Sequence, residues 1–68
     1  MKSESEKLWK NLKRIRTTKG ISQGDIARSL EVNRGFISNI EGGKTNPTLA
    51  TIARLAKAVG VSVDELLK

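Results

Sequence analysis

The residues best suited to specific recognition lie between positions 33 and 46 of this 68-residue chain. The guanidinium of Arg34 can form two hydrogen bonds with guanine O6 and N7, and the amide of Asn39 can do the same with adenine N6 and N7. The hydroxyl of Ser38 can donate or accept, so it discriminates less between bases. Because a good bidentate pair is worth about 1–3 kcal/mol of discrimination, these residue types predict the reading of base edges.

Catalytic chemistry, by contrast, has few candidate residues. The sequence contains no Cys and no His, which removes disulfides, thiol nucleophiles, most zinc sites and the commonest general base. The seven acidic residues are scattered, and the adjacent pair Asp64 and Glu65 has no partner in the sequence pattern. We therefore expect no enzymatic activity, no metal, no cofactor and no small-molecule ligand within this chain.

The charge of the chain indicates a polyanionic partner. The formal net charge is +6 and the pI is about 10.2, and nucleic acid is the commonest partner of so basic a domain. Residues 1–20 hold seven Lys and Arg against two Glu, whereas residues 21–68 hold six against five acids. For any one lysine of the first run, a solvated helix face and a direct phosphate contact remain equal alternatives.

No segment of the sequence predicts contact with a membrane. The apolar runs are far shorter than the roughly 20 residues of a membrane-spanning helix. Residues 1–6 lack the apolar core of a signal peptide. We therefore expect a cytoplasmic protein.

Apolar spacing and capping residues predict five short helices and no strand. Leu8, Leu12 and Ile15 recur at i, i+4 and i+7, which is the spacing of one helix face. Ser, Asn and Thr at positions 22, 33, 48 and 62 can cap helix starts, and glycines at 20, 42, 43 and 60 follow helix ends. The expected helices span about residues 5–19, 22–30, 34–41, 48–59 and 62–67. They form one all-α domain, residues 1–68, with a flexible N-terminus at residues 1–5.

A chain this short must use nearly all its aliphatic side chains in one core, because small domains bury only about 60% of their unfolded surface. The core stripe expected on the fourth helix begins at Leu49 and continues through Ile52 to Val59. We expect Trp9 to pack against the last helix, and Phe36 against the fourth helix or the loop before it.

The second and third expected helices form a helix-turn-helix. They are joined by only three residues, 31–33, and the second of the pair is short. Ala27 is small where the two helices must approach, and apolar residues at 26, 30, 32, 37 and 40 have the spacing to hold the pair together. The opposite side of the third helix is left with Arg34, Gly35, Ser38 and Asn39.

Three segments carry a resemblance to a known family: SQGDIA at 22–27, FISNIEGGK at 36–44 and GVSVDELL at 60–67. With them, residues 8–67 resemble the Cro and phage-repressor type of helix-turn-helix domain. The resemblance implies a five-helix lambda-repressor-like fold and sequence-specific binding of double-stranded DNA by a repressor-like transcriptional regulator. It also implies a homodimer on a pseudo-palindromic operator, with recognition helices in the major groove about 34 Å apart, as phage repressors dock.

The resemblance further implies a role for individual residues. Base contacts are implied for Arg34, Gly35, Ser38 and Asn39. Phosphate contacts are implied for Gln23, Asn33, Lys44, Thr45 and Asn46. Asn33 could instead touch a base, and Gln23 could also brace a side chain on the third helix. An ion pair between the first and third helices is implied for Arg16 and Glu41.

Dimer contacts are expected at the end of the chain. Leu66 and Leu67 are both apolar, and one chain end can scarcely bury both. We therefore expect an interface formed by the last helix and the loop before it, with Val61, Val63, Leu66 and Leu67.

Three positions depart from the family pattern. Glu31 occupies the turn position usually held by Gly, so a positive φ there would carry modest strain. Gly35 costs a helix roughly 1 kcal/mol relative to Ala; it either permits close approach of the backbone or leaves one base pair unread. Gly24 likewise lacks a side chain within the second helix, so its helix cost and its reason for being glycine are equally open.

Other functions remain open on the sequence. The main alternative is a protein-interaction module, or an antitoxin-type component, in which DNA binding is secondary. RNA binding is a weaker alternative, because the two aromatic residues, Trp9 and Phe36, offer little base stacking. A pull-down without DNA affinity would favour the protein-interaction module.

Overall fold

The computed structural model describes residues 4–68, which form five helices and no strand. The helices are α1 Glu4–Lys19, α2 Gln23–Leu30, α3 Arg34–Glu41, α4 Leu49–Val59 and α5 Val63–Leu67. The expected all-α fold of five helices is confirmed, and every expected helix boundary agrees within one residue. Of the segment 1–5 expected to be flexible, residues 4 and 5 lie in the first turn of α1, and residues 1–3 lie outside the described residues.

Side-chain caps explain where the four later helices begin. The side-chain oxygens of Ser22, Asn33, Thr48 and Ser62 each accept the backbone N–H three residues further on, at 3.0–3.2 Å. At the start of α2 the carboxylate of Asp25 also accepts the Ser22 N–H at 3.1 Å, which completes a capping box. At the start of α5 the Glu65 N–H donates to the Ser62 hydroxyl at 3.1 Å. These local bonds satisfy backbone N–H groups in the first turn of each helix.

The turn between α2 and α3 is closed at Glu31, which has φ 60° and ψ 41°. The sequence left the conformation of Glu31 open, and the structure places it in the left-handed region. The Val32 N–H reaches back to the Ala27 carbonyl at 3.0 Å, so the last turn of α2 is capped by its own backbone. A side chain in this left-handed region costs about 1 kcal/mol, and the tight turn keeps α3 directly after α2.

All five helices contribute to one apolar core. Its buried members are Leu8, Leu12, Ile15, Ile26, Ala27, Leu30, Ile37, Ile40, Leu55, Ala56, Val59 and Leu66. The expectation that Leu49 belongs to this core is wrong, because its side chain is 69% exposed. Leu49 is the first residue of α4, one turn before Ile52, where the core-facing stripe of that helix begins. The apolar spacing of α4 therefore extends one turn beyond the residues that face the core.

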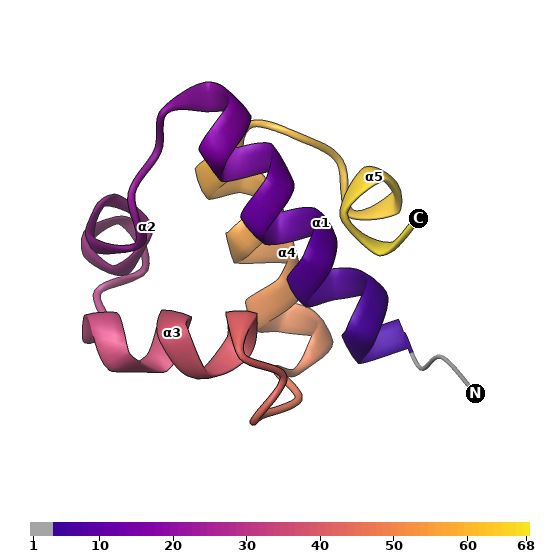
Figure 1. The fold of residues 1–68 in the computed structure, drawn as a ribbon, viewed down its shortest axis with the longest axis horizontal. Helices are drawn as coiled ribbons and strands as arrows, with labels where there is room; N and C mark the ends of the chain where they lie inside the picture. Colours follow the sequence, from indigo (N-terminus) through magenta and orange to yellow (C-terminus); the bar gives the residue numbers. More distant parts are fainter. Residues whose placement is uncertain (1–3) are drawn as a thin grey trace.

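The helices are arranged so that α3 lies along one edge of the molecule (Figure 1). α1 crosses the centre in front of α4, and it packs against α3, α4 and α5. α2 packs against α3 and α4. One long side of α3 and the loop that follows it therefore remain at the surface. Within residues 4–68, no helix has the length and apolar character needed to cross a membrane.

Candidate nucleic-acid interface

The outer side of α3 carries the candidate base-reading residues. Arg34, Gly35, Ser38 and Asn39 are all exposed, while Ile37 and Ile40 on the other side of the helix are buried. The separation follows from helix geometry, because positions 34, 35, 38 and 39 are spaced by one, three and four residues and share one face. The structure thus brings the four predicted positions together on one accessible surface.

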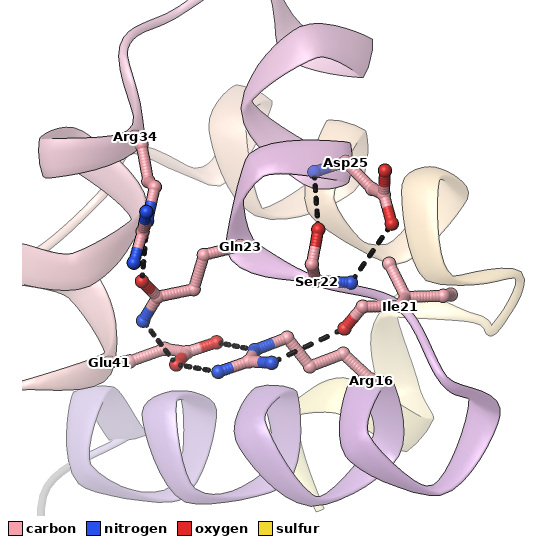
Figure 2. Close-up of polar contacts among 7 residues, drawn as sticks. All are labelled: Arg16, Ile21, Ser22, Gln23, Asp25, Arg34 and Glu41. Atoms are coloured by element: carbon pink, nitrogen blue, oxygen red, sulfur yellow. Dashed lines mark hydrogen bonds and ion pairs between the residues drawn. The ribbon is translucent and has the colours of Figure 1, made fainter.

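A chain of polar contacts connects this surface to the interior (Figure 2). The carboxylate of Glu41, whose residue is only 7% exposed, accepts hydrogen bonds from Arg16 Nε and, at 2.9 Å, from Arg16 Nη2. Glu41 Oε1 also accepts from Gln23 Nε2 at 2.9 Å. The carbonyl oxygen of Gln23 then faces Arg34, whose Nε lies 3.5 Å away. Side chains from α1, α2 and α3 therefore meet at the first turn of α2.

The Arg16–Glu41 pair is the ion pair that the resemblance implied, and it has defined partners on both sides. Arg16 Nη1 donates to the Ile21 carbonyl at 3.2 Å, so the guanidinium also holds the segment between α1 and α2. No buried side-chain nitrogen or oxygen within the described residues lacks a hydrogen-bond partner. A buried ion pair stabilises a fold only when its hydrogen bonds are satisfied, and this pair meets that condition.

The ion pair shifts the pKa values of both partners. Burial alone would raise the pKa of Glu41, but hydrogen bonds from Arg16 and Gln23 and the positive charges of Arg16 and Lys13 lower it overall. The hydrogen bond to Glu41 raises the pKa of Arg16 further. Both groups are therefore charged near neutral pH, and Glu41 acts only as an acceptor. An acceptor at this position fixes the Gln23 amide with its NH2 group inward and its carbonyl toward Arg34.

The residues predicted to contact phosphate lie at both ends of α3. Asn33 caps the start of the helix through its side-chain oxygen, which leaves its amide NH2 group able to donate. At the other end, the Lys44 N–H bonds to the Asn39 carbonyl at 2.9 Å, so the following loop stays close to the helix. In this loop Lys44 and Asn46 are exposed and Thr45 is half-buried. The loop therefore presents donors beside the outer face of α3.

The structure gives two side chains roles that the sequence did not predict. Lys19 Nζ donates to the Val59 carbonyl at 2.7 Å, at the end of α4. Arg54 Nη2 donates to the Leu30 carbonyl at 2.7 Å, at the end of α2. Cations favour the negative ends of helices, but they act here on helices distant in sequence. No local spacing in the sequence could have revealed either contact.

Trp9 supports the loop after α3. Its ring lies beside Gly43, where an added Cβ would come 3.1 Å from the indole nitrogen. Gly43 has φ +72°, so both its backbone and the nearby ring favour glycine. The ring of Trp9 thus packs against this loop, and its expected packing against the last helix stays a prediction. Contacts with both α1 and α3 therefore fix the residues just before Lys44.

The residues predicted for a dimer interface differ in exposure. Leu66 is fully buried within the single chain, and the Asn11 amide donates to its backbone carbonyl at 2.9 Å. Val61, Val63 and Leu67 are partly buried against the same core. The side chain of Leu66 therefore stabilises the position of α5, and only the other three present apolar surface.

Comparison with known proteins identifies the class to which this fold and surface belong. The helix-turn-helix family model HTH_3 matches residues 12–66. The chain belongs to this helix-turn-helix family, of the Cro/C1 type. The resemblance drawn from the sequence is confirmed.

Individual relatives fit the same class. The chain is 36% identical over 62 residues to the HTH-type transcriptional regulator DdrOP3 of Deinococcus deserti; the match covers 91% of this chain and 48% of DdrOP3, about half of that relative. The crystal structure of the hypothetical transcription factor NHTF from Neisseria has a TM-score of 0.90 at 32% identity, covering 97% of this chain and 76% of that one. The controller protein C.Esp1396I, solved as a tetramer with its natural 35 base-pair operator, has a TM-score of 0.82 at 29% identity, covering all of both chains.

Proposed function

We propose that this chain binds double-stranded DNA sequence-specifically, with α3 in the major groove, and acts as a repressor-like transcriptional regulator. The observation that carries the proposal is the outer face of α3, where four candidate base-reading positions are exposed opposite a buried apolar side. The major groove of B-DNA is about 12 Å wide and admits one α-helix. The proposal is supported by the net charge of +6 and by the operator complex of the relative C.Esp1396I.

Arg34 is the main base reader in this proposal. Its Nε faces the Gln23 carbonyl, which leaves its two terminal nitrogens available to bind guanine O6 and N7. Asn39 reads an adenine or supports its neighbour, and Ser38 discriminates weakly. Gly35 has no side chain and lets the backbone approach the bases closely.

Phosphate contacts hold the protein in place on the duplex. Gln23 still has one amide hydrogen beyond the bond to Glu41, and the Asn33 amide is likewise able to donate. Lys44, Thr45 and Asn46 would bind the backbone beyond the other end of α3. Such contacts carry no sequence information but set the position of the recognition helix.

One recognition helix reads only a few base pairs, so we propose that two copies bind a pseudo-palindromic operator as a homodimer. The partly exposed apolar side chains Val61, Val63 and Leu67 are the proposed interface. Occupation of a promoter would then block RNA polymerase, and the protein would act in the cytoplasm. Sedimentation with and without DNA tests the dimer, because a single copy per site at high concentration would contradict it.

Selection of bound duplexes from a random pool is the direct test of DNA binding. We expect a pseudo-palindromic consensus and an affinity that falls steeply with salt, because each neutralised phosphate contributes about 0.9 to the slope of log K against log salt. A chain that captures proteins but selects no sequence, and shows no salt-dependent DNA affinity, would instead support a protein-interaction module.

A further inference from the structure

The basic side chains of α1 do not share one role. Lys10 forms an ion pair with a carboxylate one turn away, and Lys19 donates to a backbone carbonyl at the end of α4. Arg16 is held by Glu41. Lys13 differs from these three, because it is exposed and forms no ion pair with any of residues 6–68. The structure thus separates lysines that the sequence left equivalent.

Lys13 lines a hollow that borders the outer face of α3. The hollow has a volume of about 270 Å³ and is lined by Lys13, Arg16, Gln23, Ser38, Glu41 and Gly42. Arg16 and Glu41 neutralise each other, so the ammonium of Lys13 gives the hollow an excess positive charge. Ser38 belongs both to this hollow and to the proposed base-reading surface. An anion in the hollow would therefore lie beside the edge of the DNA that α3 reads.

A second lysine, in the loop that follows α3, approaches the same end of this helix. The Cγ atom of Lys44 lies 3.9 Å from the position that a Cβ on Gly42 would occupy. The C-terminal end of a helix carries partial negative charge, so an anion would be repelled there without nearby cations. Lys13 from α1 and Lys44 from the loop together offset that repulsion.

We propose that the hollow lined by Lys13, Ser38 and Gly42 binds one phosphate of the DNA backbone, so that α1 is part of the interface. The proposal rests on the DNA-binding function proposed above and extends its contact surface to a third element. A lysine ammonium is a compact charge with three donors, well suited to a phosphate oxygen, and the Ser38 hydroxyl can supply a further donor. This contact would fix the position of α3 along the groove, because phosphate contacts set the register of a DNA-binding protein.

The test compares Lys13→Gln with Lys57→Gln on a duplex selected by the wild-type chain. Both variants lose one positive charge from an exposed lysine, but Lys57 lies at the end of α4 away from α3 (Figure 1). For Lys13→Gln we expect the slope of log K against log salt to shrink by about 0.9, with roughly a five-fold loss of affinity at 0.15 M salt. Lys57→Gln should leave the slope within error of the wild-type value.

A neutral methylphosphonate placed at single backbone positions locates the contact. In the wild-type complex we expect one such position near the half-site to weaken binding, and in Lys13→Gln the same substitution should have no further effect. If the methylphosphonate weakened binding by the same factor in Lys13→Gln as in the wild type, the proposed contact would be wrong. An unchanged salt slope in Lys13→Gln would also contradict it. Neither result would contradict DNA binding itself. A wild-type chain with no salt-dependent DNA affinity would instead contradict the proposed function itself.

Discussion

The two sides of α3 differ in what surrounds them. The inner side holds Ile37 and Ile40, each at most 1% exposed, and the carboxylate of Glu41 with every partner supplied by the chain. The outer side holds Arg34 and Asn39, which are exposed. One eight-residue helix therefore separates the residues that stabilise the domain from those proposed to contact DNA.

The link between the two sides is narrow. Gln23 contacts the buried carboxylate through its amide nitrogen and Arg34 through its carbonyl. A change on the inner side should therefore lower the free energy of unfolding, and a change on the outer side should alter binding alone. Substitutions on each side test this division.

The largest effect is expected for Ile37→Ala. Truncation of a fully buried isoleucine typically costs about 2–5 kcal/mol, and a domain of this size has only about 3–10 kcal/mol of stability in total. Denaturant unfolding followed by circular dichroism measures the loss. The adjacent variant Ser38→Ala should change stability by less than about 0.5 kcal/mol. Equal losses at both positions would show that α3 is not divided as described.

Glu41→Ala should destabilise the domain by about 3 kcal/mol, because it leaves the part-buried Arg16 without its partner. The pH dependence has a definite sign, since the pKa of Glu41 is lowered by folding. The stability it contributes is present above the ordinary glutamate pKa of about 4.3 and is lost as the pH falls through the lower folded-state value. Urea unfolding between pH 2 and 7 should show a smaller acid loss in Glu41→Gln than in the wild type. An identical acid loss in both would exclude Glu41 as a contributor.

Arg34→Ala should change binding and leave unfolding unaffected. We expect the affinity for the selected duplex to fall and discrimination at one base pair of each half-site to weaken by about 1–3 kcal/mol. Competition binding against duplexes substituted at each position measures the discrimination. A loss spread evenly over all positions would mean that Arg34 contacts the backbone and not a base.

Lys44→Ala is expected to weaken binding to all duplexes equally. The salt slope should shrink by about 0.9, as for any single phosphate contact, while the preferred sequence stays the same. Fluorescence titration at several salt concentrations gives both quantities. Relaxed sequence preference in this variant, with preserved preference in Arg34→Ala, would reverse the two proposed roles.

The smallest effect is expected for Glu31→Gly, in the turn before α3. Glycine removes the left-handed strain of a side chain at φ 60° but adds entropy to the unfolded chain, so we expect a net gain of about 0.5 kcal/mol. Thermal unfolding measures it. The matched change Ala53→Gly, within α4, should instead cost about 1 kcal/mol. A loss at both positions would mean that the Glu31 side chain has a stabilising role.

The predictable features of this chain are local ones. Helix starts at Ser22, Asn33, Thr48 and Ser62 could be read from the sequence, because a cap bonds to an N–H only three residues away. The outer face of α3 could be read as well, because helical spacing alone places Arg34 and Ser38 on one side. The family pattern marked Glu31 as a position where a positive φ would carry strain, and the structure has a positive φ there.

The packing of the helices determines which of several similar residues have which neighbours. The sequence did not distinguish Lys13 from Lys10, or indicate that Trp9 would lie beside Gly43. It also placed Leu49 in the core, since helical spacing specifies a face but not where the neighbouring helices end. Caps and spacing act within one or two turns of a helix. Contacts between distant segments depend on how the helices pack, and that packing is set by all five together.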